Sequence, residues 1–263
     1  MKNDGLQNEK DIIETLDGKK FYELPTFWQH RLKQLDKTIQ VNDEISCFKC
    51  VYNKKADIAI KSHDKRWNIS IKSGYFVSVH NELLSSFVGF LRSLGISEEL
   101  LNVLKLYHYG DDTTDGTGEV RHTLVEIKEK MADDIERFNK EVNKKEILTQ
   151  IIDRCLFSGT PYQKSYVSHI YYGTKDYGNM IDKKIMTEYI VNAFKCNTKA
   201  IYFGPLIYTP AYRGVNNFDK DNKHRYYVNI KWPSIGKDIK DAKQWYFDDR
   251  ESDYYIEDRK KED

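Results

Sequence analysis

Two short stretches carry most of the structural information: Ala56-Asp57-Ile58-Ala59-Ile60 and Asn68-Ile69-Ser70-Ile71-Lys72-Ser73-Gly74. Both are typical of β-strands, and the polar residues between them predict a hairpin. Because successive side chains of a strand point to opposite faces, Ser70 and Lys72 share one face while the isoleucines point into a core. Asp57 stands at the head of the first strand. The hairpin therefore places an acid beside a mid-strand lysine.

This arrangement has two interpretations. It suits metal-assisted phosphodiester hydrolysis, in which carboxylates hold a divalent cation and a lysine orients the attacking water and offsets phosphate charge. The alternative is an ordinary hairpin in which Asp57 and Lys72 form a structural salt bridge. In that case Glu82 is an acid stabilised by the dipole of the helix that begins near it.

The hairpin resembles that of the PD-(D/E)XK superfamily of restriction-endonuclease-like nucleases, in which an Asp starts one strand and an acid-x-Lys triplet lies on the next. Here Ser70 takes the place of the second acid. Some family members with Ser-x-Lys supply that carboxylate from the following helix, and Glu82, in the first turn of a helix expected over 84–94, fits this variant. The family also often uses a glutamate of an N-terminal helix, for which Glu14 is the best match and Glu9 the second.

The resemblance covers residues 9–95 and departs from the family at Ala56, where a proline is usual. It implies an α/β (α+β) fold with a restriction-endonuclease-like mixed β-sheet flanked by helices. It also implies a type II restriction endonuclease that cuts duplex DNA as a homodimer. Asp57 and Glu82 would hold Mg²⁺, and Lys72 would orient the water.

Candidates for DNA recognition lie mostly in the second half of the chain. A polar loop over 216–225 contains Asn, Lys and Arg, whose side chains read base edges. The predicted DNA-binding residues are His80, Arg213, Asn217, Lys220, Lys223, Arg225 and Lys231. The alternative is a solvated hairpin loop, with His80 a helix cap or surface residue.

The chain of 263 residues is expected to form a single domain over 1–263, since no linker or repeat divides it. Residues 9–110 would form the catalytic core, and residues 144–245 would complete the sheet and carry DNA recognition. Helices are expected over 9–16, 25–35, 84–94, 98–106, 120–143, 147–157 and 182–194. Strands are expected over 39–52, 56–61, 67–73, 166–172, 200–208 and 225–232.

Composition excludes several classes of protein. Forty-two basic and 41 acidic residues give a net charge of +1, so no field of the whole molecule indicates nucleic acid, although a local patch is compatible with it. A mean hydropathy of -0.71 and the lack of a long apolar run predict a soluble protein without membrane spans. With no secretory signal at the N-terminus, a cytoplasmic location is expected.

Other motifs are weak. Cys47 and Cys50 form a lone CxxC, interpreted as structural thiols with metal or redox chemistry as the alternative. The loop 110–118 is similar to part of a calcium loop, but His122 occupies the place of the bidentate glutamate, which favours a polar turn or a substrate-facing loop. No phosphate-binding glycine loop, serine nucleophile elbow or HExxH occurs. Two further hypotheses remain: a non-catalytic binding module on this fold, and an unrelated α/β protein of a mobile element.

Overall fold

The computed structural model describes residues 4–51, 54–163, 166–195, 199–215, 219 and 221–259. The chain divides into two compact units. Unit 1 comprises residues 1–77, 156–193 and 234–263, and unit 2 comprises residues 78–155 and 194–233. The chain thus enters each unit more than once. The single domain expected over 1–263 stays a prediction.

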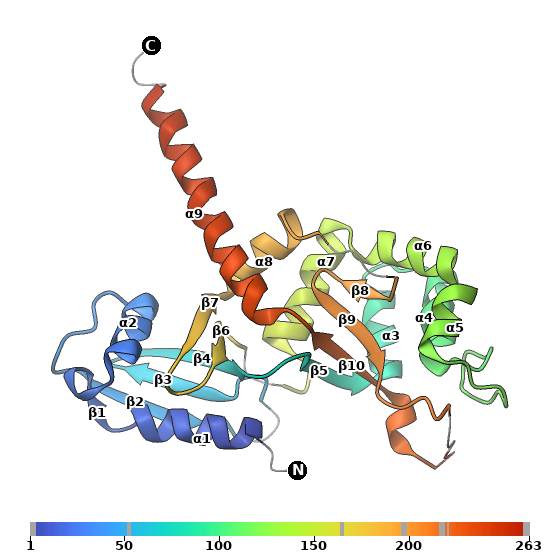
Figure 1. Cartoon of the computed structure of the whole chain (residues 1–263), viewed down its shortest axis with the longest axis horizontal. Coiled ribbons are helices and arrows are strands. Elements are labelled where there is room, and N and C mark those ends of the chain that lie inside the picture. Colours follow the sequence, from blue (N-terminus) through green and yellow to red (C-terminus); the bar gives the residue numbers. More distant parts are fainter. Residues whose placement is uncertain are drawn as a thin grey trace. The chain divides into compact units, whose positions relative to one another are not determined.

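Unit 1 contains a six-stranded mixed sheet (Figure 1). The strands in spatial order are β1 (Lys19–Lys20), β2 (Glu44–Lys49), β3 (Ile58–Ser62), β4 (Lys65–Lys72), β6 (His169–Gly173) and β7 (Gly178–Asp182). Strands β4 and β6 pair in parallel, and the other neighbours pair antiparallel. The predicted hairpin is β3–β4, with Ile58 opposite Ile69. The mixed sheet confirms the predicted α+β class built around a mixed β-sheet.

Helices of unit 1 supply the cover for this sheet. They are α1 (Asp4–Leu16), the 3₁₀ helix η1 (Phe21–Glu23), α2 (Thr26–Leu35), α8 (Lys183–Asn192) and α9 (Ile235–Arg259). Ile12 of α1 and Trp28 of α2 join a core cluster with Ile58, Ile69 and Ile71 of the hairpin. The apolar face of β3 and β4 is therefore buried, as the strand alternation requires.

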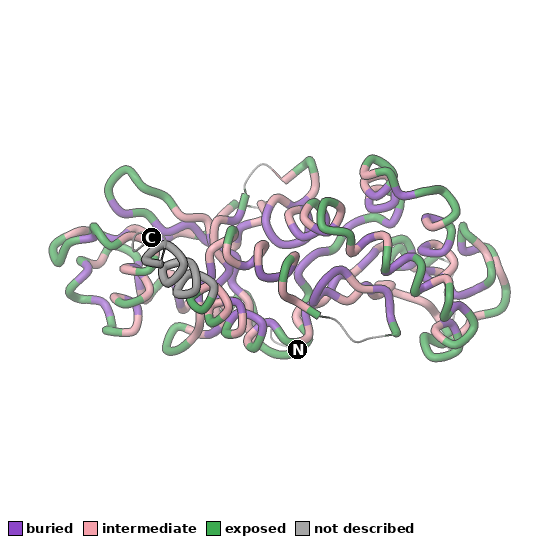
Figure 2. The backbone as a smooth tube through the Cα atoms, turned by 90° about the horizontal axis from the view of Figure 1, so that it is seen from above, coloured by how far each residue is buried: buried purple, intermediate pink, exposed green. Residues whose placement is uncertain are grey.

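Unit 2 contains a four-stranded sheet in the order β5 (Val77–Leu83), β10 (Tyr227–Trp232), β9 (Leu206–Pro210) and β8 (Tyr202–Phe203). Its helices are α3 (Leu84–Ser93), α4 (Glu98–Tyr109), α5 (Leu124–Lys130), α6 (Ala132–Val142), α7 (Lys145–Ile152) and the 3₁₀ helix η3 (Lys223–Tyr226). A π-helix, η2 (Asp153–Ser158), follows α7, and its second half, from Leu156, belongs to unit 1. Figure 2 marks the buried positions along the chain in purple.

Some predicted elements differ from the structure. The helix expected over 120–143 begins only at Leu124 and is broken at Met131 into α5 and α6. Strands β5 and β7 and helix α9 are not among the predicted elements. No helix among the described residues is long and apolar enough to cross a membrane.

Candidate active site

Asp57 links the two strands of the hairpin through a single carboxylate oxygen. Its Oδ2 accepts hydrogen bonds from Ser70 Oγ at 3.0 Å, from the Ile71 backbone N–H at 2.6 Å and from Lys72 Nζ at 2.9 Å. Strand β3 begins at Ile58, so no backbone carbonyl of β3 lies opposite the N–H of Ile71 in β4. The Asp57 carboxylate accepts that hydrogen bond instead. The structure thus brings Asp57, Ser70 and Lys72 together.

The cluster is partly open to solvent. The side chains of Lys72 and Asp57 are 17% and 24% exposed, and Lys72 Nζ also donates to the Ile71 carbonyl oxygen at 2.9 Å. All three hydrogen bonds to the Asp57 carboxylate fall on Oδ2. Oδ1 has no hydrogen-bond partner among the described residues, which leaves one anionic oxygen able to take a further ligand.

Glu9 of α1 is a second carboxylate of this cluster. Its Oε2 lies 3.3 Å from Lys49 Nζ, and its side chain is only 14% exposed. Burial and the negative charge of Asp57 raise the pKa of Glu9, while the ammonium groups of Lys49 and Lys72 oppose that rise. Glu9 and Asp57 are therefore close enough to repel each other, which is the arrangement that a bound cation relieves.

Glu14, the residue preferred by sequence, lies elsewhere on α1. Its side chain is 63% exposed and pairs with Lys10 at 3.5 Å. Helical spacing explains the difference: Glu9 is three residues before the buried Ile12, so both share the face of α1 that meets the sheet. The sequence carried this signal, because Ile12 and Leu16 continue the same apolar stripe. The participation of Glu14 in catalysis stays a prediction.

Glu82 lies in unit 2, in strand β5 and not in the first turn of a helix as expected. Arg154 holds it bidentately, with Nε donating to Oε1 at 2.9 Å and Nη2 to Oε2 at 2.6 Å. Ser86 Oγ donates to Oε2 at 2.8 Å, and His80 Nε2 lies 2.8 Å from Oε1. Burial would raise the pKa of Glu82, but the hydrogen bonds from Arg154 and His80 outweigh it and lower the pKa to about 2.

These contacts occupy both carboxylate oxygens of Glu82, whose side chain is 3% exposed. To bind a metal ion it would have to give up Arg154, a charge that is itself buried. The role of Glu82 as a metal ligand stays a prediction. His80 is likewise buried against Glu82, and its contact with DNA stays a prediction.

Asp57 and Glu9 fit a hard divalent cation. Mg²⁺ prefers oxygen ligands and is usually bound through one or two carboxylates, with water and substrate phosphates completing its shell. Among the described residues no three His, Cys, Asp or Glu side chains form a group that could hold a metal. A two-carboxylate site does not require a third protein ligand, because the substrate brings oxygens of its own.

The predicted DNA-binding residues of the second half lie in different environments. Arg225 is buried and donates to the Gly116 carbonyl, and Arg213 donates to the Tyr107 carbonyl. Arg213 thus binds the backbone of α4 and Arg225 that of the loop 110–118, and their role in DNA binding stays a prediction. Lys223 is exposed in η3, and Lys231 lies half-buried in β10. Asn217 and Lys220 lie outside the described residues.

The two weaker motifs have structural explanations. Burial raises the pKa of the Cys47 thiol to about 12 and also raises that of Cys50, which disfavours the thiolate needed for metal or redox chemistry. In the loop 110–118, the carboxylate of Asp111 accepts hydrogen bonds from Thr113 and Gly118 and pairs with Arg121. Its oxygens are therefore used by the loop itself.

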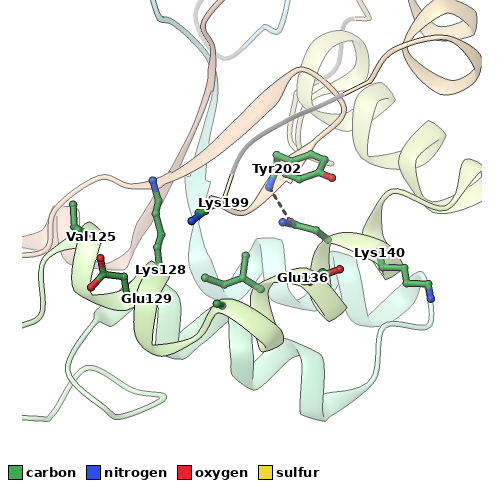
Figure 3. A pocket seen from close by; sticks show the side chains of 10 residues that line it. Val125, Lys128, Glu129, Glu136, Lys140, Lys199 and Tyr202 are labelled. Carbon is green, nitrogen blue, oxygen red and sulfur yellow. Dashed lines mark hydrogen bonds between the residues drawn. The ribbon is translucent and has the colours of Figure 1, made fainter.

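Unit 2 also contains a pocket of about 710 Å³ between α5, α6 and the segment that leads into β8 (Figure 3). Lys128, Lys140 and Lys199 line it together with Glu129 and Glu136. Both acidic and basic side chains line this pocket, so it shows no preference for a ligand of one charge.

No protein-family model and no curated protein matches this sequence. Two chains of solved structures do match. One is the restriction endonuclease MspI, whose crystal structure contains its cognate DNA. Its match has a TM-score of 0.47 and 12% sequence identity over 86% of this chain and 88% of that chain.

Proposed function

We propose that this protein is a Mg²⁺-dependent endonuclease that hydrolyses phosphodiester bonds of duplex DNA at a specific sequence. The observation that carries the proposal is the hydrogen-bonding of Ser70, Ile71 and Lys72 to one oxygen of Asp57, with the carboxylate of Glu9 within electrostatic range. A cation at Asp57 and Glu9 would supply Lewis-acid stabilisation of the phosphate and a more acidic water.

The residues of the chain have separate roles in this proposal. Asp57 and Glu9 provide anionic oxygens for the cation. Lys72, fixed by Asp57 and by the Ile71 carbonyl, directs an ammonium group at the reacting phosphate and orients the attacking water by hydrogen bonding. Ser70 holds the Asp57 carboxylate in place and leaves Oδ1 accessible. The ion pair of Asp57 with Lys72 is thus used to position both groups.

The test is incubation of the purified protein with supercoiled plasmid DNA in Mg²⁺ and, in parallel, in EDTA. Discrete fragments in Mg²⁺ alone would support a sequence-specific nuclease, and a smear would support a nonspecific one. Intact but retarded DNA in both conditions would instead support a binding module in which Asp57 and Lys72 form a structural ion pair.

The proposal includes a homodimer, since two strands of a duplex need two active sites and a palindrome matches two-fold symmetry. Sedimentation with a cognate duplex in Ca²⁺ should show two chains per duplex. One chain per duplex would restrict the proposal to a monomeric enzyme that nicks or cuts in two steps.

A further inference from the structure

The strand face that carries the catalytic cluster continues from the buried Ser70 toward half-buried and exposed polar residues. Alternate side chains of β4 share a face, so Arg66 and Asn68 lie on the same side as Ser70 and Lys72. The residues between them pack toward the core of unit 1. Arg66 is exposed and Asn68 half-buried. A polar path therefore leads along β4 from the reacting groups.

Phe48 of β2 lies on the same face, because it is opposite Ala59, which is in turn opposite Asn68. Two cations approach its ring: Lys61 Nζ and the guanidinium of Arg66 each lie 5.3 Å from the ring centroid. Both side chains belong to exposed residues, so their charge also faces solvent. The aromatic ring fixes the two cations beside each other without neutralising them.

A pocket of about 460 Å³ opens on this face. Its described lining residues are Phe48, Lys49, Cys50, Val51, Lys54, Arg66, Asn68 and Tyr166. Three of them are cations and none is an acid, in contrast to the mixed lining of the pocket in unit 2. Tyr166 is 63% exposed. The pocket therefore combines positive charge with an accessible aromatic ring, the combination that binds single nucleic-acid strands.

We propose that this face binds an unstacked nucleotide of the DNA strand next to the cleaved phosphate. The residues that form it are Phe48, Lys54, Arg66, Asn68 and Tyr166. The choice of DNA rests on the proposed function. Charge complementarity selects an anionic ligand, and the exposed tyrosine ring selects one that has a flat π-face.

Each side chain has a defined part. Lys54 and Arg66 attract the phosphates on either side of the nucleotide, and Tyr166 stacks on its base. Arg66 Nε donates to Asn68 Oδ1 at 2.9 Å. This contact orients the amide so that its NH₂ group is left to donate to a base edge. The contacts of Lys54 and Arg66 with the DNA phosphates give affinity, while the contact of Asn68 with a base edge can distinguish bases.

The test measures DNA binding by fluorescence anisotropy in EDTA, with a labelled thymidine oligonucleotide of about 20 nucleotides, long enough to cover one such site. Replacement of both Lys54 and Arg66 by Ala should reduce the slope of log affinity against log salt concentration by about 1.4, since each phosphate contact on a single strand contributes about 0.7.

Tyr166→Ala should weaken binding by roughly tenfold with an unchanged slope, and Tyr166→Phe should retain affinity. The control is the double replacement of Lys128 and Lys199 by Ala in unit 2, which should change neither quantity.

Polyphosphate serves as an anion without bases. Tyr166→Ala should not affect its binding, whereas loss of Lys54 and Arg66 should. An unchanged affinity and slope for DNA in the double variant would overturn the proposal, and equal loss of DNA and polyphosphate binding in Tyr166→Ala would overturn the stacking role. Circular dichroism verifies that the variants are folded. Because binding in EDTA does not depend on hydrolysis, failure of the nuclease proposal and failure of this one give different results.

Discussion

At the scale of single residues, the proposed cation site depends on which carboxylate accompanies Asp57. Two glutamates of α1 are chemically identical but differ in environment: Glu9 is 14% exposed beside Lys49, and Glu14 is 63% exposed beside Lys10. Burial and the negative charge of Asp57 raise the pKa of Glu9. The two positions therefore form a matched pair for mutagenesis.

Glu9→Gln should reduce Mg²⁺-dependent cleavage by at least about a hundredfold, because the amide removes one of two anionic ligands. Glu14→Gln should cleave at the wild-type rate. Initial rates on plasmid DNA at equal concentrations of folded protein provide the measurement. The reverse result, loss with Glu14→Gln and none with Glu9→Gln, would restore the residue preferred by sequence.

A substitution at Glu82 distinguishes its two possible roles, the partner of Arg154 in a buried ion pair and a ligand of the metal ion. Glu82→Gln leaves Arg154 buried without its anion, so the free energy of unfolding should fall by about 3–5 kcal/mol while cleavage per folded molecule persists. Urea denaturation measures the first quantity and initial rates the second. Loss of cleavage that a Ser70→Glu replacement then restores would instead support Glu82 as the migrated metal ligand.

At the scale of elements, α4 is joined to β9 and η3 by a buried histidine. His108 Nε2–H donates to the Arg225 carbonyl oxygen at 2.8 Å, so Nδ1 accepts from Tyr208 Oη at 2.6 Å. Both ring nitrogens are used by the neutral form. Burial lowers the pKa of His108 to about 4 against an ordinary value of 6.5.

Because burial keeps His108 neutral in the folded state, only the unfolded chain protonates this side chain between about pH 6.5 and pH 4. Protonation of the unfolded chain favours unfolding. The stability that this group contributes should be complete above about pH 6.5 and should be lost progressively as the pH falls to about 4, by roughly 3 kcal/mol in all. Urea denaturation between these pH values should show the slope. His108→Gln should flatten it, whereas replacement of the exposed His30 by Gln should not. A wild-type profile without the slope would contradict the assignment.

The elements that sequence predicted best are those with one strong pattern. Apolar and polar residues alternate along β4 from Trp67 to Lys72, and the buried residues of α3 follow helical spacing: Leu84, Phe87, Val88 and Leu91. Strand β5 was missed because its buried residues include His80 and Glu82, which alternation of apolar residues cannot reveal. Their burial depends on Arg154, 72 positions away along the chain.

At the scale of the whole molecule, the division into two units could not be predicted. The chain leaves unit 1 after Val77, returns at Leu156, leaves again after Ala193 and returns at Ser234. None of these crossings has a proline- or glycine-rich linker to mark it. The partners within the candidate site were predictable only where they are neighbours on one hairpin. Asp57, Ser70 and Lys72 meet as expected, whereas the contribution of Glu9 depends on how α1 packs against the sheet.

The central claim is that the cluster at Asp57 performs hydrolysis and is not merely a structural ion pair. The most direct measurement is the initial rate of plasmid cleavage in Mg²⁺ by the wild type, Asp57→Asn and Lys72→Ala, each checked for folding by urea denaturation. We predict that both variants lose at least about a hundredfold in rate while the free energy of unfolding changes by less than about 2 kcal/mol. Either variant cleaving at the wild-type rate would contradict the account.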